Sequence, residues 1–137
     1  GGLNIKKNNK IISTVIKKLN KNKIRTSLFI NPNLKDIKLA KKIGSRCIEI
    51  HTGKISNKIK NKQSYVKYLE NIKKCAKLGK LLDLEVHAGH GIDYKTAKIL
   101  SRIKEIEEFN IGHFIIGESI FDGFKHTIKK FKRIIKS

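Results

Sequence analysis

The clearest fold signal in this sequence is Leu84-Glu-Val-His-Ala-Gly-His-Gly91. Apolar and polar residues alternate over 84–88 and then give way to glycine, which is typical of a short strand that ends in a tight loop. Cys47-Ile-Glu-Ile-His-Thr-Gly53 has the same form. Both stretches therefore predict a strand whose end carries polar residues and glycine.

Segments with helical periodicity separate the strand-like runs. The pattern predicts strands over 26–30, 47–51, 84–88 and 109–112. It predicts helices over 8–22, from the Asn33 cap to Gly44, over 65–79, from the Asp93 cap to Ile103, and over 121–136. The fourth strand either continues or passes into a short turn through Ile116. Strands that alternate with helices of this length predict right-handed crossovers and a parallel α/β sheet.

Two architectures fit four such units, a small open doubly wound sheet and half of a (β/α)₈ barrel. A barrel takes about 250 residues, so 137 residues suit half of one. The chain begins Gly1-Gly2-Leu3 and contains no Met. We therefore expect a piece of a longer polypeptide, with residues 1–137 forming a single partial barrel domain.

The charge is strongly basic, with 32 Lys and Arg against 11 Asp and Glu and a formal net charge of +21. Only four of the cations are Arg, aromatic residues make up 7%, and the lysines are spread over every segment. Nucleic-acid readout favours Arg and stacking aromatics, so we expect a solvated lysine surface. No apolar stretch approaches a membrane span. Cys47 and Cys75 suit buried thiols in a reducing cytosol.

Polar residues gather where the predicted strands end, which is where α/β folds bind ligands. Glu49 and His51 are two residues apart and therefore lie on the same face of their strand. They are either a pair of functional groups or an ion pair that fills the barrel. His90 lies between Gly89 and Gly91, where an imidazole can overhang a cavity and exchange protons near neutral pH. The alternative for His90 is an ordinary loop histidine.

Gly112-His113 follows the last strand, a position where backbone N–H groups of a helix start often bind phosphate. The alternative is an ordinary turn between strand and helix. We expect no metal site, because the histidines near the strand ends show no metal-ligand spacing. His126 lies on the last predicted helix and is expected at the surface.

At these loops the chain resembles the pyridoxine 5'-phosphate synthase family, the ring-closing enzymes of the deoxyxylulose-dependent vitamin B6 route. The matching pieces occur in the family's order and cover essentially the whole chain. They are Gly1-Gly2-Leu3, Ser27-Leu-Phe-Ile30, Ile48-Glu-Ile-His-Thr-Gly53, Ala88-Gly-His-Gly91 and Asn110-Ile-Gly-His113 with Ile115-Ile-Gly117. They match only the C-terminal half of the family's barrel.

The resemblance implies a (β/α)₈ barrel that assembles as a cytoplasmic homo-octamer. It implies condensation of 3-amino-2-oxopropyl phosphate with 1-deoxy-D-xylulose 5-phosphate to pyridoxine 5'-phosphate, phosphate and water, with no metal or organic cofactor. Carried over by position, His90 is the proton donor and Glu49 stabilises charged intermediates. Gly91, Gly112 and His113 hold the phosphate of the aminoketone.

The chain departs from the family's usual pattern at two places. His87 stands where Asn is usual, and Glu118-Ser119 stands where Arg-Ala is usual. A carboxylate opposes phosphate binding unless Glu118 points to solvent. Because the half that holds the deoxyxylulose substrate is absent, the chain alone is expected to be inactive. An inactive barrel remnant and a lysine-rich nucleic-acid-binding domain are the alternatives.

Overall fold

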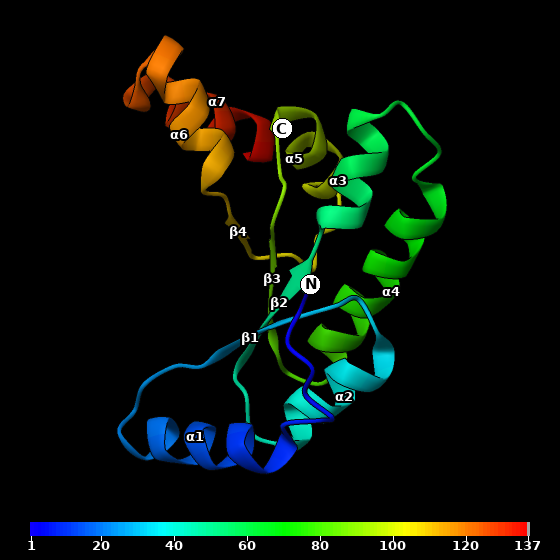
Figure 1. Cartoon of the computed structure of the whole chain (residues 1–137), viewed down its shortest axis with the longest axis vertical. Helices are drawn as coiled ribbons and strands as arrows, with labels where there is room; N and C mark the ends of the chain where they lie inside the picture. Colours follow the sequence, from blue (N-terminus) through cyan, green and yellow to red (C-terminus); the bar gives the residue numbers. More distant parts are fainter. Residues whose placement is uncertain (137) are drawn as a thin grey trace.

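The computed structural model describes residues 1–136 (Figure 1). Ser137, the last residue of the predicted domain, lies outside the described residues. The strands are β1 (Ser27–Ile30), β2 (Cys47–His51), β3 (Glu85–Gly89) and β4 (Glu108–Asn110). The helices are α1 (Asn9–Lys21), α2 (Leu34–Lys42), α3 (Gly53–Lys60), α4 (Val66–Leu81), α5 (Tyr94–Leu100), α6 (His113–Asp122) and α7 (Phe124–Lys136).

The four strands form one parallel sheet in the order β1-β2-β3-β4. A doubly wound sheet reverses direction at a switch point, whereas a barrel adds each strand beside the previous one. The unbroken order therefore favours the second architecture, and the α/β fold matches the predicted partial barrel. None of the described helices has the length and apolarity needed to cross a membrane.

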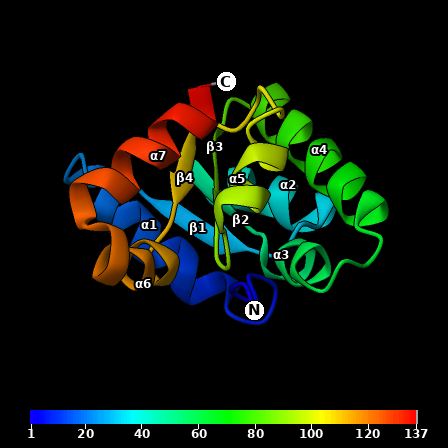
Figure 2. The same cartoon turned by 90° about the horizontal axis from the view of Figure 1, so that it is seen from above.

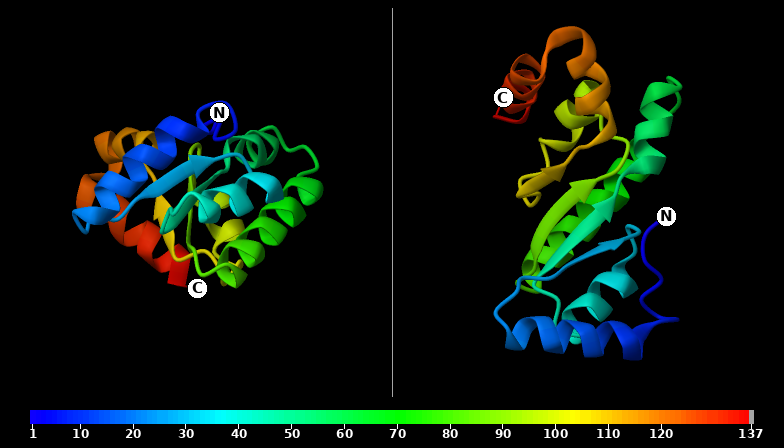
Figure 3. Two further views of the ribbon diagram at one scale, coloured as in Figure 1. Left: turned by 90° about the horizontal axis from the view of Figure 1, so that it is seen from below. Right: turned by 60° about the vertical axis from the view of Figure 1, so that its left-hand side comes forward.

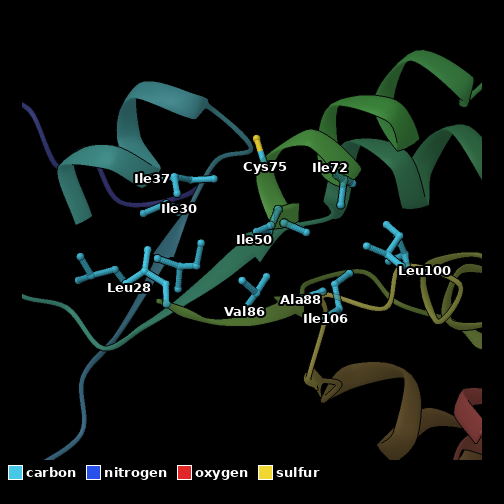
Figure 4. Close-up of a cluster of buried hydrophobic side chains, with 14 of the residues drawn as sticks. Leu28, Ile30, Ile37, Ile50, Ile72, Cys75, Val86, Ala88, Leu100 and Ile106 are labelled. Carbon is cyan, nitrogen blue, oxygen red and sulfur yellow. The ribbon is translucent and has the colours of Figure 1, made fainter. Parts of the chain in front are cut away.

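Side-chain alternation divides the sheet into two faces. Ile48, Ile50, Val86 and Ala88 belong to the buried core, where α2, α4 and α5 contribute side chains (Figure 4). The alternate residues form the opposite face, which we call the polar face. They are Cys47, Glu49 and His51 of β2, Glu85, His87 and Gly89 of β3, and Glu108 and Asn110 of β4.

Helices surround the strands when the molecule is viewed from above (Figure 2). The α1 helix crosses one end of the sheet, while α6 and α7 lie at the other (Figures 1 and 3). Ile16 of α1 is buried, and Asn20 donates a hydrogen bond to the Gly44 carbonyl just before β2. Thus α1 covers the amino ends of the strands and leaves the carboxyl ends to the other helices.

The predicted caps are largely confirmed. Asn33 accepts a hydrogen bond from the backbone N–H of Lys35, and Asp93 accepts one from Thr96. Gly44 has a φ of 89°, as expected for a left-handed residue after a helix. Gly79 does not end its helix, however. It lies inside α4, where the missing side chain makes room for Val86 and Ile48.

Two helices were missed, and several boundaries besides that at Gly79 were wrong, among them the end of the fourth strand, which stops at Asn110 instead of Gly112. The α3 helix follows β2 directly, and α6 occupies 113–122, where only a short turn was expected. The α5 helix ends at Leu100 instead of Ile103. Gly123, with a φ of 78°, separates α6 from α7, so Phe121 belongs to α6.

Candidate active site

A cavity of about 920 Å³ opens at the carboxyl ends of the strands. It brings together all five predicted site residues, which are Glu49, His90, Gly91, Gly112 and His113. These residues come from β2, the loop after β3 and the start of α6. A single cavity therefore combines a carboxylate, two imidazoles and glycine backbone amides, the groups that acid–base chemistry on a phosphorylated substrate requires.

The turn at 90–91 aims the His90 side chain at this cavity. His90 has a φ of 80° and Gly91 a φ of 75°. The left-handed region is unusual for histidine and costs about 1–3 kcal/mol when the surroundings enforce it. The buried Thr52 hydroxyl lies 2.8 Å from the carbonyl oxygens of both Gly89 and His90 and donates its hydrogen bond to them. Thr52 therefore holds the turn.

An aromatic cluster supports the His90 ring. The His51 and His90 rings stack with their centroids 4.8 Å apart, and Phe29 meets His51 edge-on at 5.2 Å. A side chain at Gly53 would lie under 3.0 Å from both imidazoles. Burial, followed by the charge of His90, lowers the pKa of His51. His51 is therefore neutral at physiological pH and provides a packing surface for His90.

Glu49 is fixed by its neighbours on the polar face. Its Oε2 accepts a hydrogen bond of 2.7 Å from the Asn110 side chain of β4. The space left by the missing side chain of Gly89 is occupied by the Glu49 carboxylate. The ion pairs found among residues 1–136 include none between Glu49 and His51. The alternative prediction, an ion pair of these two residues that fills the barrel, is therefore not supported.

The predicted phosphate site coincides with a helix start. Gly112 precedes α6, and the first N–H groups of that helix have no partner within it. Nothing lies within 4 Å of the position where a Gly112 side chain would begin. Lys60 and Ser56 of α3 line the same cavity. Amide donors and an ammonium group beside open space suit a phosphate.

The two departures from the family pattern lie in different places. His87 is buried on the polar face, with its Nε2 3.0 Å from Glu85, and it does not line the cavity. Glu118 of α6 does line the cavity and is partly buried.

The remaining expectations concern isolated side chains. His126 is exposed, as predicted. Cys47 and Cys75 are buried free cysteines, also as predicted. Burial raises the pKa of each thiol to about 11, so both thiols are protonated at neutral pH.

Sequence reasoning named the glycines that flank His90 but did not identify the side-chain contacts that hold the site residues in place. Asn110 appeared only within a matching motif, and the stacking of His51 on His90 and the roles of Thr52 and Phe29 were missed. The only sequence signal for Thr52 is that this polar residue directly follows a predicted strand. The cross-strand pairs depend on the register of β2, β3 and β4, which the sequence does not reveal.

The parallel sheet and its strand-end cavity define a protein of the TIM-barrel class. The family model described as "Pyridoxal phosphate biosynthesis protein PdxJ" matches residues 1–137, and the chain belongs to this family. A "Pyridoxine 5'-phosphate synthase" of Pelagibacter ubique (strain HTCC1062) is 63% identical over 134 residues, 98% of this chain and 56% of that protein.

More distant relatives give the same result. A "Pyridoxine 5'-phosphate synthase" of Sulfurihydrogenibium sp. (strain YO3AOP1) is 42% identical over 136 residues, 98% of this chain and 55% of that protein. One from Campylobacter fetus subsp. fetus (strain 82-40) is 35% identical over 158 residues, 99% of this chain and 61% of that protein. The chain therefore spans little more than half the length of these relatives.

Proposed function

We propose that residues 1–137 form one partial barrel domain of a pyridoxine 5'-phosphate synthase. The whole enzyme condenses 3-amino-2-oxopropyl phosphate with 1-deoxy-D-xylulose 5-phosphate to give pyridoxine 5'-phosphate, phosphate and water. The observation that carries the proposal is the convergence of Glu49, His90, Gly91, Gly112 and His113 on one cavity. Neither alternative, an inactive remnant or a nucleic-acid-binding domain, gains support from the site or the relatives.

His90 is the proton donor in this proposal. Ring formation needs repeated proton transfers during Schiff-base formation, enolisation and loss of water, and an imidazole performs these near neutral pH. Thr52 fixes the backbone of His90, and neutral His51 stacks on its ring. Both contacts restrict the imidazole to one orientation, which favours transfer to a fixed substrate atom.

Glu49 stabilises the positive charge of the iminium intermediates. Its carboxylate is held by Asn110 and lines the cavity. A fixed anion in a partly enclosed site interacts more strongly with a developing cation than the same anion in water. The Asn110 hydrogen bond leaves the second oxygen, Oε1, available on the side of Gly89.

The aminoketone phosphate binds at the start of α6. The amides that follow Gly112 donate to its oxygens, and Gly91 and His113 contribute from either side. Lys60 adds a positive charge, whereas Glu118 opposes the phosphate electrostatically. We therefore expect weaker aminoketone binding than in relatives that carry Arg at the position of Glu118.

The remaining features of the whole enzyme belong to the same proposal. The deoxyxylulose substrate binds to residues outside this chain, so the chain alone is inactive. The enzyme acts in the cytoplasm as a homo-octamer, and its reaction uses no metal or organic cofactor.

The test is an assay of the complete protein containing this chain, supplied with both substrates. His90→Gln should lower kcat by about 10²–10⁴-fold, the usual contribution of a general acid, with little change in KM. His126→Gln is the matched control, because His126 is exposed on α7 and should leave kcat unchanged. Absence of pyridoxine 5'-phosphate from the wild-type reaction, or a wild-type kcat in His90→Gln, would refute the proposal.

A further inference from the structure

Three metal-ligating side chains meet at the end of the polar face opposite the cavity. Cys47 and Glu85 are the first residues of β2 and β3 and are paired in register, and His87 follows on the same face of β3. One ligand atom from each of the three lies within 4.8 Å of the others. The Cys47 Sγ lies 3.6 Å from Glu85 Oε2, and His87 Nε2 lies 3.0 Å from Glu85 Oε1.

We propose that Cys47, Glu85 and His87 form a zinc-binding site that joins β2 to β3. A thiolate, an imidazole nitrogen and a carboxylate oxygen are the three ligand types that zinc accepts in proteins, and thiolate disfavours the hard cations Mg²⁺ and Ca²⁺. Water completes the four-coordinate shell. This site is separate from the proposed reaction and does not depend on it.

The surroundings of His87 resemble those of a metal-bound histidine. Its side chain is 2% exposed, and its two nitrogens face different carboxylates. Nε2 points to the three-residue cluster, while Nδ1 lies 3.6 Å from Glu108 Oε1 on β4. Metal-ligating histidines usually donate their second N–H to a carboxylate, which fixes the tautomer and strengthens the ligand. Glu108 is the carboxylate nearest to Nδ1, although 3.6 Å is longer than a hydrogen bond.

Charge balance also favours a dication. The carboxylates of Glu85 and Glu108 outnumber the single guanidinium of Arg25 around the cluster. When zinc binds, the S–H bond of Cys47 breaks, the Zn–S bond forms and the proton passes to solvent, so that zinc and thiolate together add one positive charge beside these carboxylates.

Arg25 competes with the metal. Its guanidinium contacts both oxygens of Glu85, at 2.6 and 2.9 Å. Half of the Arg25 side chain is exposed, so it can turn towards solvent when the metal arrives. Glu85 and Glu108 are also partly exposed, which leaves a path for the ion.

The experiment titrates the complete protein that contains this chain with Co²⁺ after treatment with a chelator, and then displaces Co²⁺ with Zn²⁺. We expect 1:1 binding, the near-ultraviolet band of a thiolate–cobalt bond and the strong visible bands of tetrahedral cobalt. Cys47→Ala should abolish the thiolate band. Cys75→Ala is the matched control, because Cys75 is also a buried free cysteine but lies on α4 away from the cluster.

Two further variants test the surroundings. Glu108→Gln should weaken binding about 10–100-fold, as loss of a carboxylate behind a ligating histidine does. Arg25→Gln removes the competing cation and should tighten binding. An unchanged affinity in Glu108→Gln, or weaker binding in Arg25→Gln, would contradict the proposed arrangement.

A measurement on the unmutated chain guards against misfolded variants. Zinc-edge X-ray absorption of the 1:1 complex should show one sulfur neighbour at about 2.3 Å together with nitrogen and oxygen neighbours. A shell of nitrogen and oxygen alone, failure to take up one metal ion per chain, or loss of the thiolate band in Cys75→Ala but not in Cys47→Ala would overturn the site.

Discussion

His90 extends its imidazole into the cavity from a backbone conformation that few non-glycine residues adopt. Such a conformation persists only when neighbouring groups enforce it. Here the enforcing groups are the Thr52 hydroxyl below the turn and Gly91, whose own positive φ continues the bend. The orientation of the proposed proton donor therefore depends on a residue that never faces the substrate.

Thr52→Val tests this dependence. The substitution keeps the shape but removes the hydroxyl, so the His90 carbonyl loses its side-chain donor and the Gly89 carbonyl keeps only the backbone N–H of residue 52. We expect a loss of about 1–3 kcal/mol in the free energy of unfolding, measured by urea denaturation. Thr14→Val is the control, because the Thr14 hydroxyl bonds to Lys10 on an exposed helix face and should change stability by less than about 0.5 kcal/mol. Equal effects at the two positions would contradict the assigned role.

The lowered pKa of His51 makes stability depend on pH. Because burial and His90 make the folded state bind this proton less tightly than the unfolded chain, protonation favours unfolding. The contribution is fully present above the unfolded value of about 6.5 and falls as the pH drops towards the lower, folded value. The free energy of unfolding should therefore decrease between pH 8 and pH 5.5, and less steeply in His51→Gln. His126→Gln should follow the wild-type slope, and an unchanged slope in His51→Gln would oppose this explanation.

Individual site residues could be predicted because parallel strands bring their carboxyl ends to one edge. That rule, together with the family resemblance, placed Glu49, His90 and Gly112 correctly in a common cavity. It could not supply their partners. In the folded sheet Asn110 pairs with Gly89, and Gly89 pairs with His51. These two registers bring the Asn110 side chain within reach of Glu49, which lies two residues before His51.

Helices α3 and α6 form much of the cavity wall, and both escaped prediction. The α3 helix has only eight residues and begins with a glycine. In α6, Phe114-Ile-Ile has the apolar continuity of a strand, and Gly117 lies inside the helix. In short segments such as these, tertiary packing outweighs local preference. Helices with a clear apolar stripe, such as α1, α2 and α4, were recognised, although their ends were less certain.

Gly79 shows how packing governs an element. Replacing a helical glycine by alanine usually stabilises by about 0.5–1 kcal/mol. At Gly79 the new methyl group would lie 2.7 Å from Val86 and 3.1 Å from Ile48. Gly79→Ala should instead destabilise the protein by about 1–3 kcal/mol through overpacking. Gly117→Ala, with nothing within 4 Å, should stabilise. Thermal or urea unfolding of both variants measures the contrast, and two changes of the same sign would refute it.

The molecule as a whole combines an apolar core with a net charge of +21. The strand order and the alternation of elements followed from the sequence because each strand–helix unit is local. The cavity did not follow so directly, since its walls come from five separate segments of the chain, at 29, 49, 56–60, 90–93 and 110–121. The net charge affects stability and does not determine the fold, because repulsion among the distributed lysines opposes every compact state.

Added salt should therefore stabilise this protein. Raising NaCl from 10 to about 150 mM shortens the screening length to about 8 Å, so the repulsion among surface lysines weakens and Tm should rise. Differential scanning calorimetry measures the change. KCl serves as the control for specific ion effects and should give the same increase. A Tm that is constant or lower in both salts would show that the charge is already compensated.

The glycine at position 89 gives its side-chain volume to the carboxylate at position 49. The residues at positions 49 and 89 therefore share one volume between neighbouring strands, and the side chain at neither position can change size independently. In a library randomised at both positions and selected for vitamin B6 prototrophy in the complete protein, survivors should pair Gly89 with Glu49. Selection for folding alone should also admit larger residues at 89, but only together with shorter ones at 49. The geometry of the sheet therefore predicts that the residues at positions 49 and 89 change together in evolution.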